Sequence, residues 1–133
     1  MDKILTKKQE FALRNLNIAS INEMQRAAVM HGRGEGDMIL LSPTGSGKTL
    51  AYMLPMLERM EPDVKKVQAV VVVPTRELAK QAGEVWRSMK LPEQMVMLYG
   101  GRPVEQEAAV FSGSSPAVVV GTPGRLIEHP AVL

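Results

Sequence analysis

The stretch Ser42-Pro43-Thr44-Gly45-Ser46-Gly47-Lys48-Thr49 decides the fold expected for this chain. It meets the P-loop pattern G-x-x-x-x-G-K-[ST] everywhere except at its first position, where serine replaces glycine. A short apolar run, Met38–Leu41, precedes it, and an apolar helical pattern extends from Leu50 to Met60 after it. We therefore predict a buried strand, a tight loop and a helix, in this order.

The residues of this loop suit phosphate groups. Gly45 and Gly47 allow backbone conformations that are closed to other residues, and so turn successive N–H groups toward phosphate oxygens. The helix that starts near Lys48 adds the positive end of its dipole. Lys48 can reach the β- and γ-phosphates, and the Thr49 hydroxyl suits a magnesium ion. An ordinary strand-to-helix loop is the alternative, which the flanking patterns disfavour.

The loop is thus predicted to bind a nucleoside triphosphate with Mg²⁺. Lys48 and Thr49 are the catalytic candidates, and Thr49 is the candidate metal ligand. The residues predicted to bind the nucleotide are Ser42, Pro43, Thr44, Gly45, Ser46, Gly47, Lys48 and Thr49.

Strand and helix patterns alternate after the loop. The helix that follows it is expected to bend at Pro55, because proline removes an internal hydrogen bond. Strands are expected at Val67–Val73, Gln94–Tyr99 and Ala117–Val120, and helices at about Arg76–Met89 and Val104–Phe111. The four consecutive valines of the first of these strands favour a central position in a parallel sheet. The fold class is therefore α/β, with helices flanking a parallel sheet.

The first 33 residues are predicted to be helical, with a break at Leu16–Ile21. Either Ser20 or Asn22 would cap a helix that runs from Glu23 to about Met30. We expect one domain made of this helical region, 1–33, and an α/β core, 34–133. Trp86 is expected to be buried, and His31 and His129 to lie at the surface or at helix ends.

Composition sets limits on the class of protein. The chain has 133 residues, 45% of them hydrophobic, which is enough for one packed domain. A net charge of +2 is too small to establish a nucleic-acid partner. The absence of cysteine excludes disulfides and thiolate metal sites. No signal peptide and no apolar run of the roughly 20 residues that cross a bilayer are found, so a cytoplasmic, membrane-free protein is expected.

Four segments together resemble one protein family. Ser42–Thr49 resembles motif I of the DEAD-box ATP-dependent RNA helicases, Pro74–Ala79 resembles motif Ia, Gly100–Gly101 the paired glycines, and Thr122–Arg125 motif Ib. They occur in the family's order and at plausible spacing. The chain is thus similar to the amino-terminal RecA-like domain of such a helicase, incomplete on its C-terminal side.

The resemblance implies roles for particular residues. Gln25 would read the adenine edge of ATP, although Asn17–Met24 departs from the family's pattern before this glutamine. Phe11 would pack on the base, with a place in the core as an equal alternative. The residues implied to contact the sugar-phosphate backbone of single-stranded or duplex RNA are Pro74, Thr75, Arg76, Gly101, Thr122 and Arg125. Hydroxyls and guanidinium groups bind phosphates without reading sequence, which agrees with this role.

Parts of the family's machinery are missing. A complete ATPase needs an acidic pair after a buried strand, and Asp2, Asp37 and Asp63 do not supply it. The D-E-A-D and S-A-T motifs and the second lobe are also absent. We therefore expect a fragment that binds ATP without efficient hydrolysis, while unwinding belongs to its parent. Exposed sheet edges make a homodimer of the fragment a further hypothesis.

Two other functions stay open. A small P-loop kinase would share the phosphate loop but would need an arginine-bearing lid and an acceptor site. A non-catalytic RNA-binding or interaction module would bind RNA without any effect of nucleotide.

Overall fold

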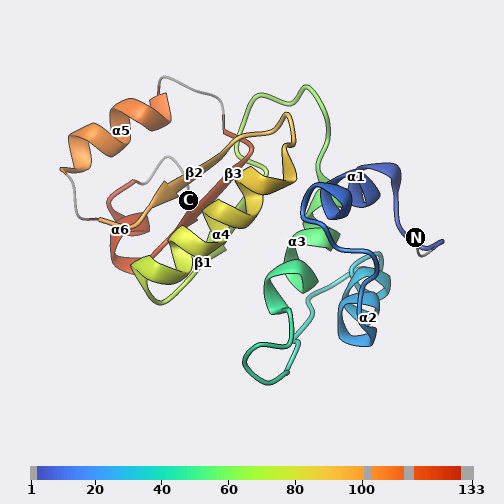
Figure 1. The fold of residues 1–133 in the computed structure, drawn as a ribbon. Coiled ribbons are helices and arrows are strands. Elements are labelled where there is room, and N and C mark those ends of the chain that lie inside the picture. The colour runs from blue at the N-terminus through green and yellow to red at the C-terminus, as the bar shows by residue number, and fades with distance from the viewer. Residues whose placement is uncertain (1–2, 101–102, 113–115, 130–133) are drawn as a thin grey trace. The chain divides into compact units, whose positions relative to one another are not determined.

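The computed structural model describes residues 3–100, 103–112 and 116–129. The chain divides into two compact units, residues 1–60 and 61–133 (Figure 1). None of the helices described is long and apolar enough to cross a membrane.

The first unit is helical. It contains α1 (Lys7–Asn15), α2 (Glu23–His31) and α3 (Lys48–Arg59). The helices bury an apolar core that consists mainly of Ala12, Leu13, Ala28, Val29, Leu50, Met53, Leu54 and Leu57. Both α1 and α2 begin with a capping box, Thr6 with Gln9 and Asn22 with Gln25, which explains where each helix starts. Asn22 is thus the cap of the second helix, and Ser20 is not.

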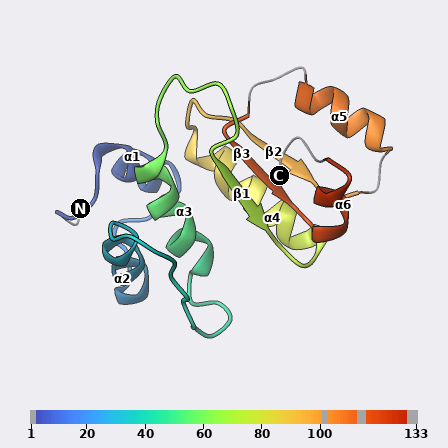
Figure 2. The same cartoon turned by 180° about the vertical axis from the view of Figure 1, so that it is seen from behind.

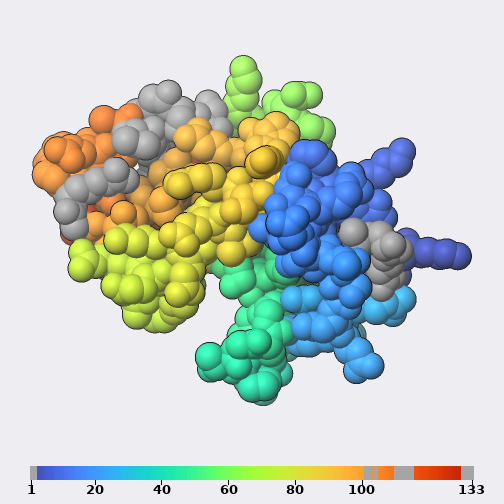
Figure 3. Space-filling model, in the orientation of Figure 1, coloured from blue at the N-terminus to red at the C-terminus, as the bar shows by residue number. Residues whose placement is uncertain are grey.

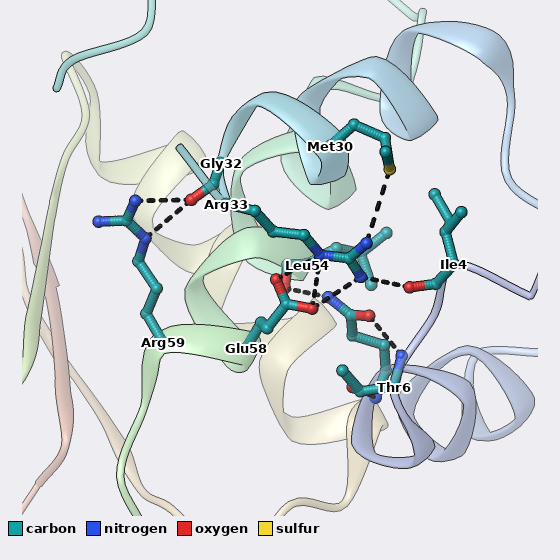
Figure 4. A network of polar contacts seen from close by, with 9 residues as sticks. Ile4, Thr6, Met30, Gly32, Arg33, Leu54, Glu58 and Arg59 are labelled. Carbon is teal, nitrogen blue, oxygen red and sulfur yellow. Dashed lines mark hydrogen bonds and ion pairs between the residues drawn. The ribbon is translucent and has the colours of Figure 1, made fainter. Parts of the chain in front are cut away.

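Polar side chains join these helices to one another (Figure 4). The buried Gln9 amide donates to the Leu54 carbonyl of α3 at 2.8 Å. Arg33, just after α2, forms an ion pair of 2.8 Å with Glu58 and also donates to the Ile4 carbonyl. Arg59 donates through Nε to the Gly32 carbonyl at 2.9 Å. The middle and the C-terminal end of α3 are therefore held by the segments around α1 and α2.

The second unit is an α/β layer structure. It contains β1 (Ala69–Val72), α4 (Arg76–Met89), β2 (Met95–Leu98), α5 (Val104–Ser112), β3 (Val118–Gly121) and α6 (Pro123–Ile127). The three strands are parallel in the order β1-β3-β2, and α4 lies across one face of the sheet (Figures 1 and 2). Val96, Leu98, Val119 and Leu126 form the buried cluster at its centre.

Much of the predicted architecture is confirmed. The α/β class, the parallel sheet and the three strands after the loop are observed, and α4 has the predicted bounds. Trp86 is buried, and its Nε1–H donates to the Glu93 carbonyl at 3.0 Å. The helix after the loop continues through Pro55 to Arg59. The prediction that the domain divides at residue 33 stays a prediction.

The strand predicted at Met38–Leu41 is wrong. This segment is irregular, and the side chains of Ile39 and Leu41 are 87% and 90% exposed; it lies at the surface in the space-filling view (Figure 3). A strand needs neighbours that pair with its N–H and C=O groups, and the described part of the first unit contains no strand. The apolar composition of Met38–Leu41 does not provide the neighbouring strand that such pairing requires.

The valine-rich strand is also not central. β3 lies in the middle of the described sheet, and β1 is at its edge, with Val72 60% exposed. A run of valines indicates a strand, but the order of strands depends on how the chain crosses over. The helix α6, which directly follows β3, was not predicted, because its five residues are too few for a periodic pattern.

Candidate functional site

The loop Ser42–Thr49 leads directly into α3. Gly47 is the N-cap of this helix, and its φ of 90° lies in the left-handed region that favours glycine. Lys48 is the first residue of the helix and is exposed, while Thr49 is half-buried. The two residues predicted to meet the phosphates and the metal are therefore at the start of the helix, as predicted.

The loop is closed by its own hydroxyl groups. The Ser46 hydroxyl donates to the Pro43 carbonyl at 2.5 Å and lies 3.0 Å from the Ser42 hydroxyl. Ser42 is the residue that replaces glycine in the motif. Its side chain therefore takes part in the turn, and the replacement is compatible with a folded loop.

The N-terminus of α3 differs from the other long helices. Thr6, Asn22 and Thr75 each cap their helix through a side-chain hydrogen bond, whereas Gly47 has no side chain to do so. The first N–H groups of a helix have no partner within the helix, and an anion can take that place together with the dipole. The start of α3 therefore fits a phosphate group.

Gln25 of α2 and Asn22, the cap of α2, hold this loop. Gln25 Nε2 donates to the Gly47 carbonyl at 3.1 Å, and Asn22 Nδ2 donates to the Ser46 carbonyl at 3.0 Å. The same two residues cap α2 reciprocally, since Gln25 Oε1 accepts from the Asn22 backbone N–H at 3.0 Å. A Cβ atom on Gly47 would collide with the Gln25 amide, which adds a second reason for glycine there.

Sequence reasoning missed this part of the site. It placed Gln25 against adenine, a role that stays a prediction, and treated Asn22 only as a possible cap. The pattern Asn-x-x-Gln at 22–25 was the available signal for the cap, but the contacts to Ser46 and Gly47 join residues that are 24 and 22 positions apart. Phe11 is 41% exposed, so its alternative place in the core is wrong.

We expect Asn22→Ala to destabilise the chain by about 1 kcal/mol, because it removes a helix cap and the bond to the Ser46 carbonyl. Urea denaturation followed by circular dichroism measures this change. Ser20→Ala is the matched control, since it removes the other side chain considered as a cap of α2, and should leave the free energy of unfolding unchanged. Equal effects of the two variants would contradict the assigned cap.

The second unit brings the other predicted segments together. Parallel strands end at the same edge of a sheet, and Val72, Leu98 and Gly121 are aligned in register. The Val73 N–H donates to the Gly121 carbonyl at 3.0 Å, and the Thr122 N–H donates to the Leu98 carbonyl at 3.2 Å. The segments that follow the three strands therefore lie at one edge. Gly101 lies outside the described residues.

The segment after β1 presents polar groups at this edge. Pro74, Thr75 and Arg76 are all exposed, and Thr75 caps α4 by accepting from the Leu78 N–H at 3.2 Å. The hydroxyl proton of a threonine remains able to donate to an acceptor such as a phosphate. Lys80 was not predicted here; its Nζ lies 5.4 Å from the centre of the Tyr99 ring, which joins α4 to the turn after β2.

The segment after β3 carries a buried ionic cluster. The side chain of Arg125 is only 16% exposed, and its Nε lies 3.3 Å from Oε1 of the buried Glu107. Arg125 Nη1 also lies 2.9 Å from Glu128 Oε2. His129 is buried with Nε2 3.2 Å from the same oxygen of Glu107, so the prediction of a surface position for His129 is wrong. Thr122 is half-buried.

No cluster of protein metal ligands is found in the described part of the chain. Residues 3–100, 103–112 and 116–129 contain no group of three or more His, Cys, Asp or Glu side chains that could hold an ion. Magnesium in nucleotide sites keeps several waters and takes phosphate oxygens together with few protein ligands. A single hydroxyl, that of Thr49, is compatible with that arrangement.

Comparison with known proteins decides the family. The profile of the DEAD/DEAH box helicases matches residues 22–131, which include the loop Ser42–Thr49 and all three segments that follow the strands. The chain belongs to the DEAD/DEAH box helicase family. The family resemblance inferred from four short motifs is thereby confirmed.

Relatives within the DEAD/DEAH box helicase family are similar over most of this chain. The probable ATP-dependent RNA helicase YfmL of Bacillus subtilis is 40% identical over 110 residues, which are 81% of this chain and 28% of that protein. The ATP-dependent RNA helicase DeaD of Escherichia coli K12 is 36% identical over 121 residues, or 89% of this chain and 19% of that protein. The chain thus spans less than a third of the length of these relatives.

Solved structures support the RecA-like fold of a DEAD-box helicase domain. Mss116p bound to single-stranded RNA and AMP-PNP has a TM-score of 0.83 and 27% identity, covering 94% of this chain and 27% of its own. A DEAD box protein from Methanococcus jannaschii has a TM-score of 0.84 and 27% identity, covering 97% of this chain and 36% of its own.

Proposed function

We propose that this chain is the ATP- and RNA-binding part of an ATP-dependent RNA helicase. The observation that carries the proposal is the glycine-rich loop at the start of α3, where no side chain caps the helix by a hydrogen bond and Lys48 is exposed. Membership of the DEAD/DEAH box family supports it. ATP hydrolysis and RNA unwinding are proposals for the whole protein.

The nucleotide part of the proposal rests on the first unit. The loop Ser42–Thr49 would surround the β- and γ-phosphates with backbone N–H groups, and Lys48 would neutralise their charge. Thr49 would give one oxygen to Mg²⁺, whose other ligands come from phosphates and water. Gln25 would select adenine, and Phe11, being exposed on α1, is free of the core and so available to the base.

The RNA part of the proposal rests on the second unit. Pro74, Thr75 and Arg76 after β1, and Thr122 and Arg125 after β3, would bind the sugar-phosphate backbone, with Gly101 as a further contact. Three parallel strands of aligned register support their convergence at one edge. Because hydroxyls and guanidinium groups bind phosphates without reading bases, binding would be independent of sequence and weakened by salt.

The remaining expectations are also proposals. Duplex RNA is proposed as a second ligand of the segments that follow the three strands, and the cytoplasm is the proposed location. A homodimer of this chain would cover the edge strand β1, whose Val72 side chain is exposed. A monomeric mass in light scattering at high protein concentration would count against the dimer.

The RNA proposal is tested by fluorescence anisotropy with a labelled single-stranded RNA, at several salt concentrations, with and without Mg·ATP. We expect Arg76→Gln to weaken binding several-fold and to reduce the slope of log K against log salt by about 0.7, the contribution of one phosphate contact on a single strand.

Arg87→Gln is the matched control, because Arg87 is also exposed but lies in the last turn of the same helix. Equal effects of the two variants would contradict the proposed position of the RNA. Binding that nucleotide does not alter would favour the non-catalytic module over the helicase part.

A further inference from the structure

Glu107 is a buried acid at the edge proposed for RNA. Its side chain is fully buried in the first turn of α5, and one of its oxygens, Oε1, is shared by Arg125 Nε at 3.3 Å and His129 Nε2 at 3.2 Å. A carboxylate loses its hydration when it is buried, and this cost is offset only by partners of good geometry. The position of Arg125 is therefore tied to that of Glu107.

Arg125 also contacts the turn after β2. A Cβ atom on Gly100 would lie 3.2 Å from Arg125 Nη2, so the guanidinium packs directly against this part of the backbone. Gly100 has a φ of 81°, which a residue with a side chain adopts only with strain. Arg125 therefore contacts α5 through Glu107 and the turn through Gly100, while it belongs to α6 itself.

The cluster thus joins segments that are far apart in the sequence. Glu107 and Arg125 lie on different helices, and the Thr122 N–H donates to the Leu98 carbonyl just before the Gly100 turn. Two of the three segments proposed to bind RNA are fixed to each other in this way. A guanidinium held by a carboxylate also loses less rotamer freedom when it meets a phosphate.

We propose that Glu107 is a positioning residue for RNA binding. It holds the Arg125 guanidinium in place and, through it, fixes the turn at Gly100 relative to Thr122. The inference rests on the proposed binding of RNA by the second unit. The proposal predicts that loss of the Glu107 carboxylate weakens RNA binding. If charge alone mattered, removal of an acidic side chain near a polyanion would strengthen that binding instead.

The experiment compares three variants of this chain by fluorescence anisotropy with a labelled single-stranded RNA. Glu107→Ala is expected to weaken RNA binding about tenfold, which is the scale of one charge-assisted contact. Glu107→Gln keeps an oxygen that accepts from Arg125 and is expected to lose only about threefold. Glu105→Ala removes an exposed acid from the same turn of α5 and should leave binding equal or slightly tighter.

The outcomes separate the positioning role from the RNA proposal. Absence of RNA binding by the wild-type chain would overturn the RNA proposal, and the positioning role with it. Binding by folded Glu107→Ala that equals or exceeds wild type overturns the positioning role alone. Where circular dichroism shows that Glu107→Ala is unfolded, Glu107→Gln decides: weaker binding than Glu105→Ala supports the role, and equal or tighter binding overturns it.

Discussion

Replacing Lys48 by alanine is expected to lower the affinity of this chain for Mg·ATP by about a hundredfold. Lys48 is exposed at the first position of α3, beside the helix end that fits a phosphate. Truncation of one partner of a close charge pair costs about 2–5 kcal/mol, and about 2.7 kcal/mol corresponds to this factor. Alanine favours helices, so the variant should fold normally.

Calorimetric titration with Mg·ATP, ADP and GTP measures this effect. Lys65→Ala is the matched control, since Lys65 is an exposed lysine that lies outside the first unit, and it should bind as the wild type does. The affinities of the wild type for ATP and GTP show whether binding prefers adenine. The same titrations of Gln25→Ala show whether that preference depends on this glutamine. Unchanged ATP affinity in Lys48→Ala would contradict the assignment of the loop.

Replacing Val119 by aspartate is expected to abolish folding of the second unit. Val119 is fully buried in the middle of β3, between β1 and β2, and belongs to the central apolar cluster. An aspartate there would lose its hydration without gaining a partner, at a cost of several kcal/mol. Since whole domains are stable by about 5–15 kcal/mol, a single buried charge can exceed the available stability.

Val72→Asp is the matched control for this prediction. Val72 has the same side chain in an adjacent strand of the same sheet, but it is 60% exposed at the edge. Its replacement should change stability by less than about 1 kcal/mol in urea denaturation followed by circular dichroism. If Val72→Asp unfolds the unit as well, the expected contrast between the buried strand β3 and the exposed edge position is contradicted.

Features governed by neighbours in the sequence could be predicted well. The helix at Arg76–Met89 was predicted with its observed bounds, because its cap, Thr75, and its apolar spacing are local. The β-branched residues of Val118–Val120 likewise indicated a strand. The start of α3 at Lys48 followed from the glycines before it.

Features that join distant residues could not be predicted. Met38–Leu41 has the composition of a strand, yet pairing depends on a neighbour that composition does not specify. His129 was expected at the surface or at a helix end, because its neighbours in the sequence offer no partner and Glu107 is 22 residues earlier. The hydrogen bond from Gln25 to the Gly47 carbonyl and the contact of Arg125 with Gly100 were also missed, because each joins residues more than 20 positions apart.

The sequence alone therefore determined the glycine-rich loop before α3, the family and the α/β class, since each depends on residue types at short, fixed spacing. Tertiary structure decided which strand is central, which apolar residues are buried, and how Glu107, Arg125 and His129 come together. The physical reason is that burial and ion pairing depend on distances in space, and these are set by how the whole chain packs.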